Sequence, residues 1–116
     1  MRELAPQQVQ DVRAVVREVA ALYFAGNTDR ALAMLRGRLQ TREVARPRHL
    51  AMYALRRWCG FSWHELGYAF CRDHSTAVDA VQGIERELRA GTNGAKAEVE
   101  ALARVLGREV QCPGSR

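Results

Sequence analysis

The sequence predicts a compact all-α domain, and three observations support this class. Apolar residues recur at intervals of three and four, which is the period of an amphipathic helix. No segment stands out for the strict apolar and polar alternation of a half-buried strand. The 116 residues, 47% of them hydrophobic, are enough to form one core without cross-links. We therefore expect a single domain over residues 1–110 and a short tail over 111–116.

Two predicted helices precede a basic loop. The first covers about residues 7–25, ends at Gly26 and carries an apolar stripe made of Val9, Val12, Val16, Val19, Ala20 and Tyr23. The polar triplet at 27–29 offers caps for a second helix, whose inward residues would be Leu32, Leu35 and Leu39. A glycine and a proline then interrupt the pattern, so residues 36–48 are predicted to be a helix end and a basic loop.

Two further helices have recognisable starts. The third helix is predicted to follow Pro47, because proline suits a first helical position, and to stop near Gly60. Ser62 and Glu65 then form a capping box, S-x-x-E, which predicts a fourth helix over about residues 63–70.

The residues that follow complete a helix-turn-helix over about residues 62–89. After a tight turn, Asp73 is the expected N-cap of a helix whose apolar face consists of Ala77, Val81, Ile84 and Leu88. The opposite face carries Ser75, Asp79, Gln82 and Arg86. A linker at 90–94 precedes a last helix, marked by Val99, Leu102, Ala103, Leu106 and Val110.

The positive charge of the chain is concentrated in one stretch. The net charge is +5, whereas residues 36–57 hold seven arginines and one glutamate, a local net charge of +6. Lys96 is the only lysine, and arginine binds phosphates and base edges with a two-pronged fork that lysine lacks. This clustering favours a nucleic-acid partner, although a GC-rich genome and an ordinary solvated face would also produce it.

Several classes of function find no support in the sequence. No apolar run of about 18 residues could span a membrane, and the N-terminus lacks the apolar core of an export signal. Three widely spaced cysteines fit a reducing cytoplasm. The spacing of Cys59, His64, Cys71 and His74 lacks the close pairs of a zinc site. Because there is also no catalytic triad and no G-x-x-x-x-G-K-[ST] loop, we expect no enzyme activity, cofactor, metal or small-molecule substrate.

Three blocks of the sequence carry a family pattern. They read ARPRHLAMYALRR at 45–57, SWHELGYAF at 62–70 and RDHSTAVDAV at 72–81. In order and spacing they resemble the C-terminal DNA-binding domain of the bacterial replication initiator DnaA, over about residues 38–90. The resemblance implies an all-helical domain that binds the asymmetric sites called DnaA boxes. A basic loop would enter the minor groove, and the helix-turn-helix would read the major groove.

The resemblance also assigns roles by position. Base reading falls to Arg72, Asp73, His74, Ser75 and Thr76, of which the last three can hydrogen-bond base edges from the front of a recognition helix. Asp73 can equally be a plain helix cap. Phosphate contacts fall to Arg48 and Arg56, and Arg46 belongs to the same block. The family's minor-groove arginine aligns with Gln40, so Arg38 or Arg42 would have to replace it.

The sequence departs from the family at two further places. Cys71 stands where the family has two glycines, which shortens the turn by one residue. The exposed side of the recognition helix carries Asp79, Gln82 and Gly83 in place of basic residues. Each lost phosphate contact lowers affinity and reduces the salt dependence by roughly one unit of slope.

We therefore expect sequence-specific binding of double-stranded DNA by a stand-alone relative of this domain, without the ATPase domain, in the cytoplasm at the nucleoid. Binding would regulate replication initiation or transcription. The alternative is a protein-binding adaptor that contacts the initiator or its regulators and hardly touches DNA. The acid and the glycine on the recognition helix motivate this alternative, and the first and last helices offer surfaces for it.

Overall fold

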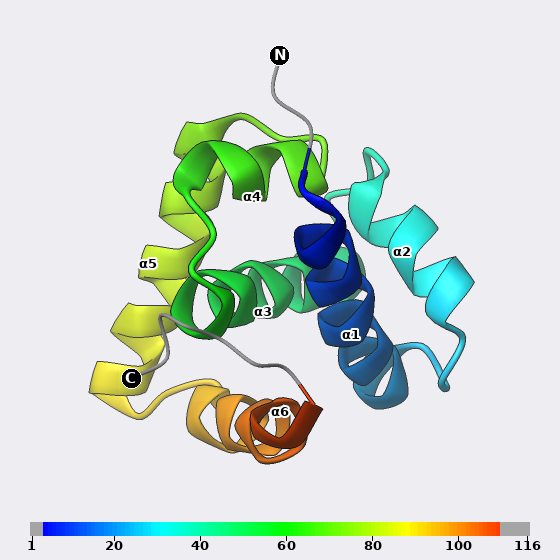
Figure 1. The fold of residues 1–116 in the computed structure, drawn as a ribbon. Helices are drawn as coiled ribbons and strands as arrows, with labels where there is room; N and C mark the ends of the chain where they lie inside the picture. Colours follow the sequence, from blue (N-terminus) through cyan, green and yellow to red (C-terminus); the bar gives the residue numbers. More distant parts are fainter. Residues whose placement is uncertain (1–3, 110–116) are drawn as a thin grey trace.

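Helix α3 lies at the centre of the fold and contacts each of the other five helices (Figure 1). The computed structural model describes residues 4–109, and all regular structure in this range is helical. The helices are α1 (Pro6–Tyr23), α2 (Thr28–Arg36), α3 (Arg42–Cys59), α4 (Trp63–Ala69), α5 (His74–Ala90) and α6 (Ala95–Glu109). The predicted all-α class is confirmed for the described residues.

The core forms around the inner side of α3. Leu50, Met52 and Leu55 of this helix have no exposed surface. α1 packs against α3, and Val12, Val16, Val19 and Ala20 of its predicted stripe are buried together with Val15, whereas Val9 and Tyr23 of that stripe are 46% and 36% exposed. Burying a side chain of this size contributes roughly 1.5–3 kcal/mol to the free energy of unfolding. The apolar periodicity of the sequence therefore determines which face of each helix packs inward.

The start of α3 differs from the prediction. The helix begins at Arg42 and not after Pro47, which lies inside it. Pro47 lacks the N–H that would bond to the preceding helical turn. Val44 and Pro47 are both buried, however, and their packing offsets the missing hydrogen bond. Tertiary burial thus outweighs the local preference of proline for a first helical position.

The basic loop is consequently shorter than predicted. It covers residues 37–41 only, and three of the arginines assigned to the basic region, Arg42, Arg46 and Arg48, lie on α3. Leu39 was expected to face inward, but it is 49% exposed because it lies in this loop and not on α2.

The other helix boundaries agree closely with the predictions. Asn27 caps α2 by accepting a hydrogen bond from the amide of Arg30 at 3.0 Å. The capping box of α4 is confirmed, since the amide of Glu65 donates to the Ser62 hydroxyl at 3.1 Å and the amide of Ser62 donates to the Glu65 carboxylate at 2.9 Å. Gly60 ends α3 with a φ of +70°. No described helix is long and apolar enough to cross a membrane.

The apolar faces of the last two helices pack as predicted. Ala77, Val81 and Ile84 of α5 are buried, and Leu88 is partly buried against the core. In α6, Leu102 and Leu106 are buried and Val99 is partly buried. Val110, which was expected to continue this face, and the predicted tail at 111–116 lie outside the described residues.

Candidate nucleic-acid interface

The turn between α4 and α5 is held by a Schellman motif. The amide of Cys71 donates to the carbonyl of Tyr68 at 3.4 Å, and the amide of Arg72 donates to the carbonyl of Gly67 at 2.8 Å. Cys71 has a φ of +56°, the left-handed conformation that glycine usually supplies at this position. One cysteine therefore forms the turn for which the family pattern has two glycines.

Gly67 allows α4 to approach the beginning of α5. A Cβ atom at this position would lie 2.4 Å from the carbonyl oxygen of Arg72 and 3.3 Å from backbone atoms of Asp73 and His74. The first separation is shorter than any normal contact between such atoms, and a backbone carbonyl cannot rotate out of the way. Glycine at this position therefore sets the distance between the two helices of the motif.

Four of the five residues predicted to read bases lie together at the front of α5. Asp73 occupies the N-cap position, and His74, Ser75 and Thr76 form the first turn. All four residues are exposed. The side chain of Asp73 makes no capping hydrogen bond, so its carboxylate is available to a partner outside the helix. The structure thus presents a continuous polar front at the point where a recognition helix enters a groove.

Arg72 is the fifth of these residues, and its side chain is directed at backbone carbonyls. The guanidinium donates hydrogen bonds to the carbonyls of Phe70 at 3.3 Å, Cys71 at 3.2 Å and Gly37. The bond to Gly37 ties the turn of the helix-turn-helix to the basic loop between α2 and α3. The role of Arg72 as a base contact stays a prediction, whereas its structural contacts are direct.

A cleft of about 590 Å³ lies beside this front, between α4 and α5. The residues that line it all carry polar groups and include His64, Tyr68, Asp73 and His74. The imidazole rings of His64 and His74 lie 4.4 Å apart between their centroids. Sequence reasoning assigned no role to His64, because a separation of ten residues across a turn produces no periodic signal.

Arg48 was expected to contact phosphates, but it is only 1% exposed. Its guanidinium donates hydrogen bonds to the carbonyls of Leu35 at 2.7 Å, Leu39 at 3.0 Å and Gly37 at 3.4 Å. Burial lowers the pKa of Arg48, and the nearby charge of Arg72 lowers this pKa further. The structure corrects the assignment, since Arg48 holds the basic loop from its inner side and does not face a phosphate.

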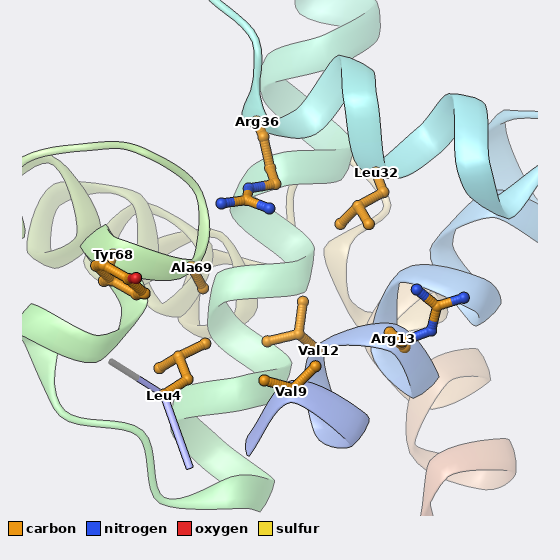
Figure 2. A pocket seen from close by; sticks show the side chains of 8 residues that line it. All are labelled: Leu4, Val9, Val12, Arg13, Leu32, Arg36, Tyr68 and Ala69. Carbon is orange, nitrogen blue, oxygen red and sulfur yellow. The ribbon is translucent and has the colours of Figure 1, made fainter. Parts of the chain in front are cut away.

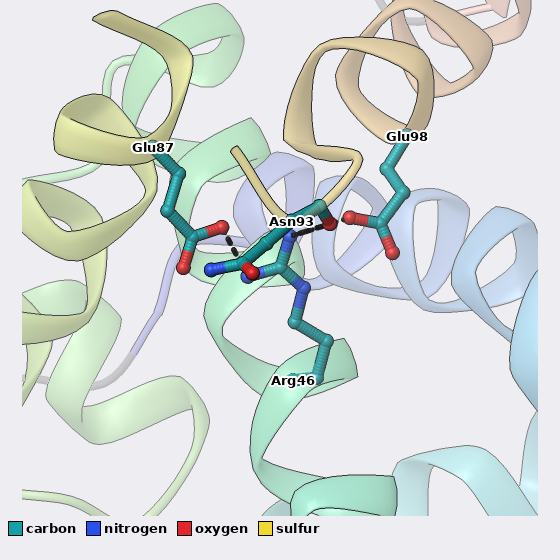
Figure 3. Close-up of polar contacts among 4 residues, drawn as sticks. All are labelled: Arg46, Glu87, Asn93 and Glu98. Atoms are coloured by element: carbon teal, nitrogen blue, oxygen red, sulfur yellow. Dashed lines mark hydrogen bonds and ion pairs between the residues drawn. The ribbon is translucent and has the colours of Figure 1, made fainter. Parts of the chain in front are cut away.

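Arg46 is also engaged within the fold (Figure 3). Its guanidinium forms ion pairs with Glu87 of α5 and with Glu98 of α6, the latter at 2.6 Å, and donates to the carbonyl of Asn93 at 3.3 Å. The Arg46 side chain is only 13% exposed. Arg46 therefore joins three helices. Its position does not support the expectation that it contacts phosphates.

The remaining arginines of the predicted set are exposed, namely Arg38, Arg42 and Arg56. The guanidinium of Arg56 lies 4.0 Å above the ring of Trp63 and donates to the carbonyl of Phe61 at 2.9 Å. These two contacts fix the side chain beside the start of α4. On the outer side of α5, Asp79 and Gln82 are exposed and add no positive charge.

A second hollow, of about 340 Å³, is lined by residues of α1, α2 and α4 (Figure 2). Its apolar lining includes Val9, which is 46% exposed, and Tyr68, which is 37% exposed. Among the described residues that line it, Arg13 and Arg36 are the charged groups and none is acidic. The guanidinium of Arg36 also donates to the sulfur of Cys71 at 3.8 Å, so this groove borders the turn of the helix-turn-helix.

The arrangement of α4, the turn and α5 defines a class of protein. A short capped helix, a tight turn and a longer helix with an exposed polar front make this a helix-turn-helix domain. The family model "Bacterial dnaA protein helix-turn-helix" matches residues 25–84. The chain therefore belongs to the family of the bacterial DnaA helix-turn-helix, which is a DNA-binding domain and not an enzyme.

Curated relatives agree with this family. The chain is 33% identical over 108 residues to the chromosomal replication initiator protein DnaA of Deinococcus radiodurans, which covers 92% of this chain and 21% of the relative. It is 32% identical over 88 residues to DnaA 1 of Protochlamydia amoebophila, covering 76% of this chain and 18% of the relative. The chain thus spans about a fifth of the length of the relatives that it matches.

Proposed function

We propose that this chain binds double-stranded DNA in a sequence-specific manner at DnaA-box-like sites. One observation carries the proposal. The hydrogen bond from Arg72 to the carbonyl of Gly37 joins the front of α5 to the basic loop at 37–41. A recognition helix in the major groove and arginines near the loop in an adjacent minor groove would then act as one rigid unit.

The exposed residues have distinct roles in this proposal. His74, Ser75 and Thr76 hydrogen-bond base edges, and Asp73 accepts a hydrogen bond from a cytosine amino group. The exposed arginines near the loop and at the start of α4, Arg38, Arg42 and Arg56, reach phosphates or the minor groove. Because the outer side of α5 carries Asp79 and Gln82 beside Arg86, it is not basic throughout, and we expect weaker non-specific binding than a fully basic recognition helix would give.

A titration of labelled duplexes tests the proposal. A duplex that carries a DnaA box should bind more tightly than a scrambled duplex of the same length and composition, at two salt concentrations. The difference should persist at the higher salt concentration, because base contacts are screened less than phosphate contacts. Equal and weak binding of both duplexes would contradict the sequence-specific function.

Substitutions separate base contacts from phosphate contacts. His74→Ala or Thr76→Ala should reduce the preference for the box, with each lost base contact costing about 1–3 kcal/mol. Arg38→Ala, Arg42→Ala or Arg56→Ala should each reduce the salt slope by roughly one unit, and Arg56→Ala, which removes a phosphate contact alone, should weaken all duplexes alike. Loss of preference in the arginine variants alone would reverse these assignments.

We further propose that occupancy of these sites at the nucleoid regulates replication initiation, by competition with the initiator, or regulates transcription from similar sites. A competition assay distinguishes the first role. Purified chain should displace the host's full-length initiator from a labelled box, and the His74→Ala variant should do so less well. Absence of displacement at saturating chain would favour transcriptional control.

The groove of Figure 2 favours a second candidate function, docking of a protein partner. Its exposed Val9 and Tyr68 together with Arg13 and Arg36 suit an amphipathic segment that carries carboxylates. In this case the purified initiator of the host should bind the immobilised chain after nuclease treatment. Val9→Glu should abolish this binding, whereas the exposed Glu100→Ala on α6 should retain it. Binding that is lost with nuclease would exclude the adaptor function.

A further inference from the structure

His64 and His74 form a ring pair across the turn of the helix-turn-helix. His64 is the second residue of α4, and His74 is the first residue of α5. Their ring centroids are 4.4 Å apart, and their planes are inclined by 36°. This distance lies just below the range of about 4.5–7 Å that is usual between the centroids of interacting aromatic rings. The two rings therefore pack against each other at the surface.

The backbone positions of His64 and His74 are fixed by contacts within and between α4 and α5. The capping box between Ser62 and Glu65 fixes the first turn of α4, which carries His64. The close approach at Gly67 and the hydrogen bond from the amide of Arg72 to the carbonyl of Gly67 fix the turn that leads into α5. The backbones are thus fixed, whereas both imidazoles are exposed and open to the cleft between the helices. Among the described residues, the ring contact with His64 is the interaction that restricts the side chain of His74.

We propose that His64 is a positioning residue for base recognition: its ring holds the imidazole of His74 in the orientation in which His74 meets a base edge. This inference rests on the proposed function. An exposed histidine at the first turn of a helix would otherwise sample several rotamers, and DNA binding would have to immobilise one of them. Packing against His64 selects this rotamer in the free protein, so that less conformational freedom is lost on binding.

The proposal predicts that the ring of His64 matters and that its nitrogens do not. His64→Ala removes the ring and should reduce the ratio of box affinity to scrambled-duplex affinity by about three- to tenfold, the range of a surface aromatic contact. His64→Phe keeps a ring at the same place and should retain the wild-type ratio. Because His64 is exposed, both variants should fold, which urea denaturation verifies.

A double-mutant cycle tests whether the two histidines act together. In the His74→Ala background, His64→Ala should have no further effect on the affinity ratio, because there is no ring left to position. The inference is overturned if His64→Ala keeps the wild-type ratio, if His64→Phe loses as much as His64→Ala, or if the two alanine substitutions are additive. Loss in His64→Phe would indicate that an imidazole nitrogen contacts DNA directly.

A measurement without DNA separates this inference from the proposed function. Three-bond couplings of the His74 side chain, measured by NMR, should indicate one rotamer in the wild type and in His64→Phe. They should indicate averaging in His64→Ala. Unchanged couplings in His64→Ala would overturn the inference even if the wild type prefers a DnaA box. A single His74 rotamer in a protein that prefers no duplex would contradict the proposed function alone.

Discussion

The guanidinium of Arg72 donates a hydrogen bond to the backbone carbonyl of Gly37, which lies 35 residues earlier in the chain. The same carbonyl accepts a hydrogen bond from the buried Arg48 at 3.4 Å. Two arginines therefore converge on one carbonyl, one from the turn before α5 and one from α3. The basic loop and the recognition helix are thereby fixed relative to each other, before any DNA is bound.

Removal of Arg48 should destabilise the whole domain. Arg48→Ala deletes a 1% exposed side chain and leaves the carbonyls of Leu35 and Leu39 without their donor. Each unsatisfied buried polar group costs about 1–3 kcal/mol. We expect the free energy of unfolding to fall by about 2–4 kcal/mol, measured by urea denaturation.

Arg38→Ala is the matched control, because Arg38 comes from the same basic segment but is exposed. Its effect on the free energy of unfolding should stay within about 0.5 kcal/mol. If both variants lost equal stability, the assignment of Arg48 to the interior would be wrong. If neither lost stability, the hydrogen bonds from Arg48 to the loop would contribute nothing net.

Two glycines of the helix-turn-helix should respond in opposite directions to alanine. Gly67→Ala places a Cβ atom 2.4 Å from the carbonyl oxygen of Arg72, and such overpacking costs about 1–3 kcal/mol or more. Gly83→Ala meets only the side chain of Arg86, at 3.7 Å, within α5. Alanine is about 1 kcal/mol more favourable than glycine in a helix interior. Thermal unfolding should therefore show a lower midpoint for the first variant and a higher one for the second.

The sequence predicted the helices well, because local signals determine them. The capping box at Ser62 and Glu65 and the apolar periodicity of α5 depend on residues close in the chain, and both are confirmed. The start of α3 was wrong because it depends on tertiary packing. Burial of Val44 and Pro47 allows proline inside a helix, an outcome that no local rule contains.

The same distinction between local and distant contacts separates the parts of the site that the sequence could predict from those that it could not. The front of α5 was predictable because the capping box fixes the start of α4 and the short turn after α4 places Asp73 at the N-cap position of α5. The roles of the arginines were not predictable, because arginine binds phosphates as readily as it binds carbonyls or carboxylates within a protein. Arg48 and Arg46 belong to the second kind, through contacts with residues distant in the chain. Composition alone cannot distinguish the two kinds.

Stability should depend on pH through His49. Burial lowers the pKa of His49 below its ordinary value of 6.5, the charges of Arg48 and Arg46 lower it further, and the carboxylate of Glu87 opposes them. The unfolded chain therefore binds a proton at a higher pH than the folded chain does. By linkage, this contribution to stability is fully present above the unfolded pKa and is lost as the pH falls below about 6.5.

Urea denaturation of the wild type and His49→Gln between about pH 5.5 and 7.5 measures this contribution, since neutral glutamine cannot titrate. The free energy of unfolding should decrease with falling pH more steeply in the wild type than in the variant. Identical slopes would show that the imidazole of His49 titrates alike in the folded and unfolded states.

Replacement of Cys71 by glycine should stabilise the turn before α5. Cys71 adopts a φ of +56°, which costs a residue with a Cβ atom about 1–2 kcal/mol and costs glycine almost nothing. Glycine also has more freedom in the unfolded chain, and this offsets part of the gain. We expect Cys71→Gly to raise the free energy of unfolding by about 0.5–1 kcal/mol.

Cys71→Ala is the control, because it loses the same sulfur contact with Arg36 but keeps the strained Cβ atom. Equal stability of the two variants would mean that the turn is not strained, and the family's glycines would then need another explanation.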